Sequence, residues 1–279
     1  MRNGFQFKDH HSSEFGVTVK TKSRPICPSV KSFTVDLPCR DGVYDFSKSN
    51  SCGRVMYNDR IITVALYVGA DDIYDMQKKL TGLSLWLQGD GKLIFDDMPF
   101  IVWRGKITDE ILYMPEHGGS KAVMEVSFQV KPFGQCLFGT EGPVIDVPAF
   151  KLNDNIAIGM DSMYTFAIGG KGNVRMNNFG DRPIRPVIKL GSAASGIKLA
   201  LGDKYLSFTT SGETTVDFEK QNVINSNGEL VNVSGEFFEF PPGEGLLHIE
   251  NSNTSGLIVK FEFTPEFTYN VYFEKIKWG

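Results

Sequence analysis

Alternation of apolar and polar residues is the strongest pattern in the first half of the chain. It is clearest over residues 124 to 131, whose apolar members are Met124, Val126, Phe128 and Val130. Successive side chains of a strand point to opposite faces of a sheet. This period of two therefore predicts an antiparallel strand with one buried face.

Similar patterns predict strands at residues 61 to 68, 93 to 95 and 100 to 107. The last two are separated by Asp-Asp-Met-Pro at residues 96 to 99, and these residue types favour turns. We therefore expect the last two strands to form a hairpin.

One segment follows a helical period instead. Apolar residues recur there at steps of three and four, at Ile73, Met76, Leu80, Leu83 and Leu87. Asp71 and Asp72 suit the N-cap and first turn of a helix, and the glycines at 89 and 91 suit its end. The pattern predicts one helix, with its apolar stripe packed on the sheet.

The pattern changes between residues 140 and 155, where two prolines and several turn-forming residues disfavour a long helix or a central strand. We place a domain boundary here, giving domains 1–142 and 143–279. Beyond it, short alternating segments predict strands at 186 to 190, 214 to 219, 236 to 240, 246 to 250 and 257 to 263. Their spacing predicts a second domain that is a β-sandwich or jelly roll.

Composition narrows the classes of partner. The chain has 279 residues and a net charge of −4, and residues 143–279 carry the excess acid, with 12 basic and 16 acidic side chains. No cluster of lysine and arginine suggests a surface for nucleic acid. The longest apolar stretch, near residues 61 to 68, is too short for a membrane helix, and the N-terminus has no apolar core of a secretory signal. We expect neither nucleic-acid recognition nor membrane insertion.

Candidate chemistry is sparse. His10 and His11 are adjacent, and on a strand they would point to opposite faces rather than toward one metal ion. A Ser-His-Asp triad would need His117 or His248 to be positioned by the fold. The four cysteines, Cys27, Cys39, Cys52 and Cys136, have no zinc-binding spacing, and we expect unpaired thiols.

Carboxylate pairs at Asp71/Asp72, Asp96/Asp97 and Asp109/Glu110 are interpreted as a helix cap, a turn and a solvated face, not as a glycosidase pair. Glycine-rich residues 89 to 91 and 169 to 173 do not match a phosphate-binding loop and are expected to be turns. We predict no enzyme, no catalytic residue, no cofactor and no metal site.

Aromatic residues in the second half leave one alternative open, because flat rings can stack on sugars. The candidates are Phe237, Phe238, Phe240, Tyr269, Tyr272, Phe273 and Trp278. Phe238 and Phe240 alternate with Glu239, which favours a buried row for at least part of the set.

Several motifs, taken in order, resemble one known family. They are residues 4–7 with 12–17, Arg-Asp-Gly-Val-Tyr-Asp-Phe at 40–46, Leu-Trp-Leu at 85–87, residues 92–99, the strand at 122–133, Asn-Asn-Phe-Gly-Asp-Arg-Pro-Ile-Arg-Pro at 177–186, and residues 235–245 with Phe-Pro-Pro-Gly. The chain resembles the distal tail proteins of siphophages, often called Dit, over nearly its whole length.

This resemblance implies a mainly β protein with a β-sandwich belt domain carrying one helix and a hairpin, followed by a galectin-like β-sandwich. It implies a ring, commonly hexameric, between the tail tube protein and the tail-associated lysin or hub at the virion tail tip, assembled in the host bacterial cytoplasm. A receptor-binding protein is a further expected partner of the acidic second half. The alternative is a carbohydrate-binding protein that recognises host cell-wall glycans; the inserted sugar-binding domain of larger relatives has no room here.

Assembly needs broad contact patches rather than reactive groups. We select Arg40, Asp41 and Tyr44 as candidate contacts to a neighbouring subunit or the tail tube, against the alternative of a solvent-facing loop with Tyr44 in its own core. The last strand, about residues 267 to 278, is expected to pack back on the first domain.

Overall fold

The computed structural model describes residues 4–39, 41–49, 53–117, 120–137, 164–253 and 256–270. The chain divides into two compact units, Met1–Gly134 with Thr268–Asn270, and Gln135–Phe267 with Val271–Gly279. The boundary expected at residue 142 lies outside the described residues. Both units are built mainly of β-strands, as predicted.

The first unit holds an antiparallel sheet whose strands run in the order β2-β1-β7-β8-β10-β6-β3, with β9 beside β10. Their bounds are β2 His10–His11, β1 Phe5–Phe7, β7 Asp90–Phe95, β8 Met98–Ile107, β10 Lys121–Val130, β6 Arg60–Gly69, β3 Val17–Ser23 and β9 Met114–Glu116. β6 and β10 pair along their whole length, and the predicted alternation of buried residues on β10 is confirmed. The predicted hairpin is β7 and β8, closed where Phe95 pairs with Met98.

The sheet of the first unit folds over on itself. β8 joins β10 only near the ends of both strands, from Gly105 to Ile107. The ring of Phe128 on β10 consequently packs against two rings from β1, at 5.5 Å from Phe5 and 5.2 Å from Phe7 between centroids. Opposed halves of one sheet therefore enclose this core.

The predicted helix is α1 (Ile73–Trp86). The Asp72 side chain caps it by accepting from the Asp75 N–H at 2.8 Å. Met76, Leu83 and Trp86 are buried, whereas Ile73, expected on the same stripe, is 60% exposed. The Trp86 ring stacks on Phe5 at 5.3 Å, and its indole N–H donates to the Phe7 carbonyl at 3.0 Å, so the helix packs on β1. A short 3₁₀ helix, η1 (Ser12–Phe15), precedes β3.

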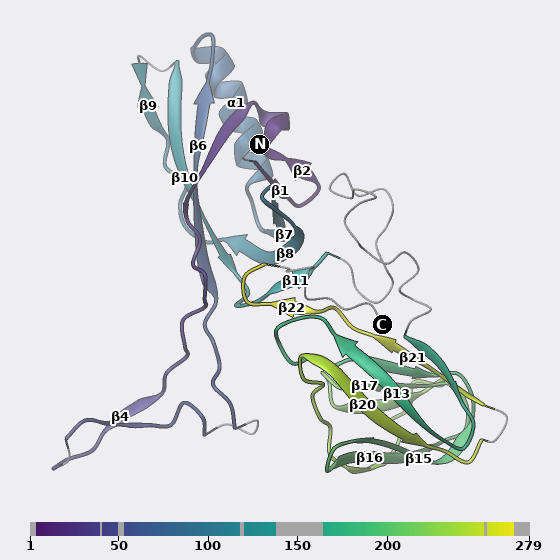
Figure 1. Ribbon diagram of the computed structural model, residues 1–279. Coiled ribbons are helices and arrows are strands. Elements are labelled where there is room, and N and C mark those ends of the chain that lie inside the picture. Colours follow the sequence, from purple (N-terminus) through teal and green to yellow (C-terminus); the bar gives the residue numbers. More distant parts are fainter. Residues whose placement is uncertain are drawn as a thin grey trace. The chain divides into compact units, whose positions relative to one another are not determined.

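A separate hairpin lies between β3 and β6 in sequence. It consists of β4 (Thr34–Asp36) and β5 (Val43–Asp45), which pair only with each other. Figure 1 shows it at the end of two long segments that leave the sheet of the first unit. Nothing in the apolar pattern predicts these short strands, because all six of their residues are exposed.

The second unit contains two five-stranded sheets, in the orders β12-β21-β14-β17-β18 and β13-β20-β15-β16-β19. The bounds in the first are β12 Thr165–Ile168, β21 Leu257–Glu262, β14 Val187–Leu190, β17 Thr214–Asp217 and β18 Asn222–Asn225. In the second they are β13 Lys171–Asn178, β20 Gly243–Glu250, β15 Ala194–Leu201, β16 Lys204–Thr210 and β19 Val233–Gly235. Two short strands, β11 (Gly134–Cys136) and β22 (Glu266–Phe267), also pair.

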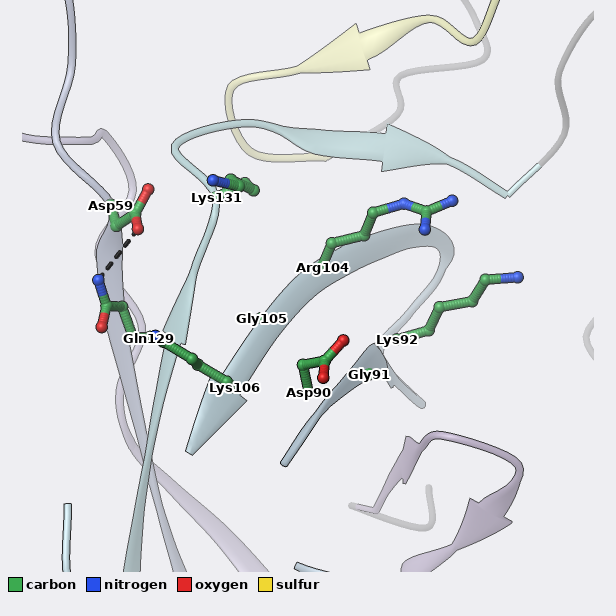
Figure 2. Close-up of a pocket in the computed structure, with 9 residues that line it drawn as sticks. All are labelled: Asp59, Asp90, Gly91, Lys92, Arg104, Gly105, Lys106, Gln129 and Lys131. Carbon is green, nitrogen blue, oxygen red and sulfur yellow. Dashed lines mark hydrogen bonds between the residues drawn. The ribbon is translucent and has the colours of Figure 1, made fainter. Parts of the chain in front are cut away.

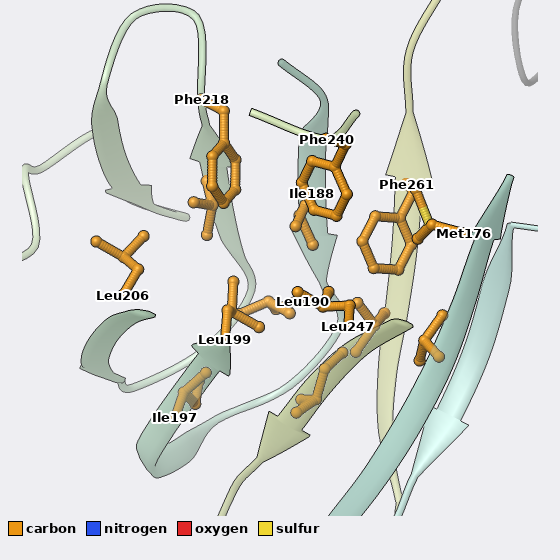
Figure 3. Packing of buried hydrophobic residues seen from close by; sticks show 14 of the residues in the cluster. Met176, Ile188, Leu190, Ile197, Leu199, Leu206, Phe218, Phe240, Leu247 and Phe261 are labelled. Carbon is orange, nitrogen blue, oxygen red and sulfur yellow. The ribbon is translucent and has the colours of Figure 1, made fainter. Parts of the chain in front are cut away.

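Apolar side chains from both of these sheets fill one core. Figure 3 shows Ile188 and Phe261 from one sheet meeting Leu199 and Leu247 from the other, and all four are fully buried. Both faces converge on a single apolar layer, which is the arrangement of a β-sandwich. The predicted sandwich is confirmed for the second unit.

The predicted strands differ from the observed ones at identifiable places. Strands predicted at 186–190, 214–219, 246–250 and 257–263 correspond to β14, β17, β20 and β21. Residues 236–240 form no ladder: their backbone is linked through Phe240, which exchanges hydrogen bonds with Ile184, and the nearby strand is β19. β12, β13, β15, β16 and β18 were not predicted.

Gly105 marks the point where β8 approaches β10 most closely. A Cβ at this position would lie 2.4 Å from the Gln129 carbonyl oxygen, whereas at Gly69, on β6, it would meet nothing within 4 Å. We predict that Gly105→Ala lowers the free energy of unfolding by about 1–3 kcal/mol, as overpacking does, while Gly69→Ala changes it by much less. Urea unfolding followed by the fluorescence of Trp86 and Trp103 measures both; equal effects would contradict the close-approach argument.

Candidate assembly site

The segment between β3 and β6 forms an arm, defined here as residues 26–57. Backbone hydrogen bonds cross it at three levels: Asn58 N–H to Ser29 O at 2.9 Å, Lys31 N–H to Met56 O at 2.8 Å, and Phe46 N–H to Phe33 O at 2.8 Å. β4 and β5 continue the ladder toward the tip. At about 3.3 Å per extended residue, the roughly ten residues from Ser29 to Cys39 at the tip span about 30 Å.

The arm is unusually apolar for an exposed segment. Its exposed large hydrophobic residues are Ile26, Val30, Phe33, Val35, Leu37, Val43, Tyr44 and Phe46. Rings gather near the tip, where Tyr44 lies 4.7 Å and Phe33 6.0 Å from Phe46 between centroids. An isolated two-stranded hairpin is marginally stable in water, and contiguous apolar exposure marks an interaction surface. The arm therefore has the chemistry of a surface that a partner covers.

Two of the three selected contact residues lie on this arm. Tyr44 is on β5 and 42% exposed, so it is not placed in a core of its own. Asp41 is exposed in the turn between β4 and β5. Arg40 lies outside the described residues. Residues 41–46 of this motif thus lie at the tip, but no pattern in the sequence indicates the length of the arm beneath them.

The base of the arm is held by a buried cation. Arg60, the first residue of β6, is 3% exposed. Its guanidinium donates to the carbonyls of Pro132 at 2.7 Å, of Pro25 and Ile26 at 3.1 Å each, and of Thr268. It also lies over the Trp103 ring at 5.0 Å. A buried charge is costly without partners, and these carbonyls supply them.

A second arginine fastens the strand that leads into the arm. Arg24 forms a bidentate ion pair with Asp97, with one N–O distance of 2.9 Å, and lies over the rings of Phe95 and Tyr269 at 4.9 and 5.9 Å. The hydrogen bond from Arg24 holds the pKa of the Asp97 carboxyl below its usual value. Asp97 therefore has a structural role in the β7–β8 turn, and residues 268–270 of the expected last strand belong to the first unit. Residues 271–279 lie outside the described residues.

A chain of hydrogen bonds with the composition of a catalytic triad occurs where sequence reasoning did not place it. His11 Nδ1 lies 2.7 Å from Ser13 Oγ, and His11 Nε2 lies 3.0 Å from Asp96 Oδ1. The same Nδ1 accepts from the Ser13 backbone N–H and caps η1, so its lone pair is already used. His11 and Asp96 side chains are each about 30% exposed. The cluster is explained as a cap that ties η1 to the β7–β8 turn, and His117 and His248 do not join it.

The described residues also contain no metal-binding group and no membrane-spanning helix. There, His, Cys, Asp and Glu form no group of three that suits a metal ion. Within these residues no helix is long and apolar enough to cross a membrane. Cys27 and Cys39 are free and exposed and Cys136 is free and buried, whereas Cys52 lies outside the described part of the chain.

Among the described residues, the phenylalanines considered for sugar stacking pack into the core of the second unit and form no exposed platform. Phe238 and Phe240 are each 2% exposed and pack around Phe218 in the core, and Phe237 also packs against this core. Tyr269 lies in the first unit over Arg24. Tyr272, Phe273 and Trp278 fall outside the described residues. The burial of Phe238 and Phe240 agrees with the buried row that their alternation with Glu239 favoured.

Comparison with known proteins shows what the chain is similar to. Residues 10–130 match the family model described as the phage tail protein RIFT-related domain. The fold matches the crystal structure of Dit (gp 19.1) of phage SPP1, called a paradigm of the hub adsorption apparatus in phages that infect Gram-positive bacteria, with a TM-score of 0.63 and 14% identity over 94% of this chain and 98% of that one. The chain resembles a siphophage distal tail protein. No curated protein matches the sequence.

Two further matches are baseplate structures of phage P2 in its activated conformation. The one with Ca has a TM-score of 0.38 at 10% identity, covering 94% of this chain and 98% of that one. The one with Sr has a TM-score of 0.35 at 10% identity, covering 90% and 91%. The family model and the Dit fold confirm the expected resemblance and support a structural role in a phage tail.

The Arg24–Asp97 pair predicts a pH dependence. Because the folded-state pKa of Asp97 is lowered, its ionised form stabilises the fold above its unfolded-state pKa of about 3.9, and that contribution is lost as pH falls through the folded-state pKa. The Asp97 side chain is 52% exposed, so we predict that Asp97→Asn costs only about 0.5 kcal/mol at pH 7. The difference from the unmodified protein should vanish at the acid end of a pH series of urea unfolding curves.

Asp109→Asn is the matched control, because Asp109 is exposed and forms no ion pair with the described residues. If both variants showed the same pH dependence, the pair with Arg24 would not be its cause.

Proposed function

We propose that this protein is a structural distal tail protein of a long-tailed phage or prophage, and that it forms a ring linking the tail tube to the tail-associated lysin and receptor-binding apparatus. The ring is a hexamer by analogy with the family that the chain resembles. Its place is the tip of the virion tail, after assembly in the host bacterial cytoplasm. The protein acts by contact and not by catalysis.

The apolar arm is the observation that carries this proposal. A segment with all of β4 and β5 exposed gains stability only when another surface covers it. A second copy of the chain is a partner that is always present at the same concentration. When the covering surface differs from the arm itself, the contact is head-to-tail, and repetition of such a contact forms a ring if the rotation from copy to copy closes.

Tail tube, lysin and receptor-binding proteins would then bind the faces of the ring. Interfaces of this kind bury broad patches with a few aromatic anchors. Tyr44 and Phe46 are candidates for such anchors, with Asp41 beside them in the turn. This assignment deepens the expected role of residues 40, 41 and 44 without requiring a reactive group.

The arm predicts how assembly responds to mutation. Replacing Tyr44 and Phe46 by serine is expected to raise the concentration for half-assembly about tenfold or more, since burial of aromatic anchors is lost. Joining Lys31 directly to Met56 through Asn-Gly should abolish rings, because those two residues are already hydrogen-bonded across the arm. Sedimentation velocity and negative-stain imaging over a concentration series give the readout, in the presence of tail tube protein if the free chain stays monomeric.

Tyr205→Ser is the control for Tyr44, because Tyr205 has nearly the same exposure, 44% against 42%, and lies on β16 in the second unit. Rings that persist after loss of the arm would refute this route to assembly.

Carbohydrate recognition remains a second candidate, supported by a different observation from the one first considered. A row of side chains crosses one face of the second unit from Asn173 through His248 and Ala200 to Tyr205. His248 bridges Asn173 at 2.7 Å and Glu250 at 3.1 Å, and the hydrogen bond from His248 lowers the pKa of Glu250. Polar groups beside an exposed ring are the elements of a sugar-binding face.

The two candidates predict opposite outcomes for the same variants. If this face binds host cell-wall glycans, Tyr205→Ser and His248→Ala should each weaken binding to purified cell walls about tenfold, whereas Tyr44→Ser should not. A sedimentation assay with labelled protein distinguishes them. Unchanged retention on cell walls in all three variants, or no retention at all, would eliminate the glycan candidate.

A further inference from the structure

A cationic hollow lies on the sheet of the first unit. It has a volume of about 430 Å³ and is lined by β7, β8, the end of β10 and the residue before β6. Its charged side chains are Lys92, Arg104, Lys106, Lys131, Asp59 and Asp90, and all are exposed. Four cations against two carboxylates leave an excess charge of +2. Figure 2 shows Lys92 and Arg104 extending side by side from neighbouring strands.

Two of these cations lie directly opposite each other on the sheet. Lys92 pairs directly with Arg104 across β7 and β8, and the backbone of Lys131 is hydrogen-bonded to that of Arg104 at 3.0 Å. Like charges directly opposite each other on a sheet are destabilising. Asp59 accepts a hydrogen bond from Gln129 at 3.0 Å, and among the described residues Lys92, Lys106 and Lys131 form no ion pair. An anionic partner would offset this repulsion.

The tip of the arm carries the complementary charge. Residues 34–46 contain Asp36, Asp41 and Asp45 against Arg40 alone, an excess of −2. Hydrogen bonds from Ser47, one of them from its backbone N–H at 2.8 Å, lower the pKa of Asp45, so that group is ionised at neutral pH. The tip thus offers carboxylates beside the exposed rings of Tyr44 and Phe46.

The hollow also has an apolar border that suits those rings. Ile61 on β6 is 45% exposed and pairs with Gln129, one of the lining residues. Tyr44 or Phe46 could pack on Ile61 while carboxylates meet the cations. Oppositely charged groups fix the register of such a contact, and apolar burial supplies affinity.

The tip of an arm cannot reach the cationic hollow of the same copy. Asp59 lines the hollow and directly follows the base of the arm, where Asn58 is hydrogen-bonded to Ser29. The tip is roughly 30 Å further along a paired ladder. Resting on the proposed function, we infer that the acidic tip of one copy docks in the cationic hollow of the next copy. Tip and hollow are unlike surfaces at opposite ends of one arm, so the contact is head-to-tail and repeats around a ring.

Reciprocal charge reversal tests this inference in the full chain. Asp41→Lys with Asp45→Lys, or Lys106→Glu with Lys131→Glu, should each raise the concentration for half-assembly about tenfold or more in sedimentation velocity. Combining all four substitutions should restore assembly to within about threefold of the unmodified protein, because the charges again complement each other. The control is Lys20→Glu with Lys78→Glu, two exposed lysines outside the hollow, which should leave assembly unchanged.

Covalent trapping supplies a readout that does not need stable rings. Cys39 is free and exposed at the tip. With Cys27 and Cys52 replaced by serine, Lys131→Cys should give an oxidised ladder of dimers and larger species on non-reducing gels. Adding Cys39→Ser should abolish the ladder, and Lys78→Cys in place of Lys131→Cys should not produce one.

The outcomes separate this inference from the proposed function. Suppose that arm removal abolishes rings, but the lysine reversals behave like the control and no disulfide-linked ladder forms. The arm is then required for assembly, but the hollow is not its docking site. If the reversals instead abolish binding of a short DNA duplex and spare assembly, the hollow binds phosphate and the inference is overturned. If arm removal leaves rings intact, the proposed route to assembly fails first.

Discussion

The buried guanidinium of Arg60 is the constraint on which the first unit depends. Arg60 is 3% exposed, yet its hydrogen bonds reach segments that are far apart in sequence: the entrance of the arm at Pro25 and Ile26, the end of β10 at Pro132, and Thr268 near the end of the described chain. Its described hydrogen-bond partners are carbonyls, and hydrogen bonds to a charged group are about twice as strong as neutral ones. Loss of the cation would leave these carbonyls without this donor.

The hydrogen bonds of Arg60 explain how a long arm can keep a defined position where it joins the sheet. The first strand of the arm is fixed by Arg60 at Pro25 and by the Arg24–Asp97 pair, and the second strand runs directly into β6 at Arg60 itself. Both legs are therefore attached to the rigid sheet, whereas the tip has only its own ladder. A surface held in its bound conformation loses less entropy on association. The arm is rigid where it joins the sheet and available where a partner would bind.

The sequence predicted those elements whose information is local. β6, β10 and α1 follow their hydrophobic periods because each presents one face to a core, and the Asp72 cap and the β7–β8 turn are encoded within a few residues. The arm has no such pattern, since β4 and β5 bury neither face. The alternation about Glu239 correctly favoured burial of Phe238 and Phe240, but the strand that it also predicted at residues 236–240 forms no ladder. The hydrogen bond between His11 and Asp96 joins residues 85 positions apart, which no spacing rule reveals.

Charged and apolar residues are distributed differently over the surfaces of this protein. Over the whole sequence the net charge of −4 is modest and suggests no partner. When charges are counted surface by surface, however, the cationic hollow has an excess of +2 and the arm tip an excess of −2. These two excesses cancel in the net charge, so the composition conceals them. A self-complementary chain needs no net charge to assemble, only separation of the two signs onto surfaces that cannot meet within one copy. Such separation makes association specific for another copy and sensitive to salt. The apolar residues of the arm alone would bind any apolar surface. The combination is therefore what distinguishes an assembly arm from an aggregation-prone edge.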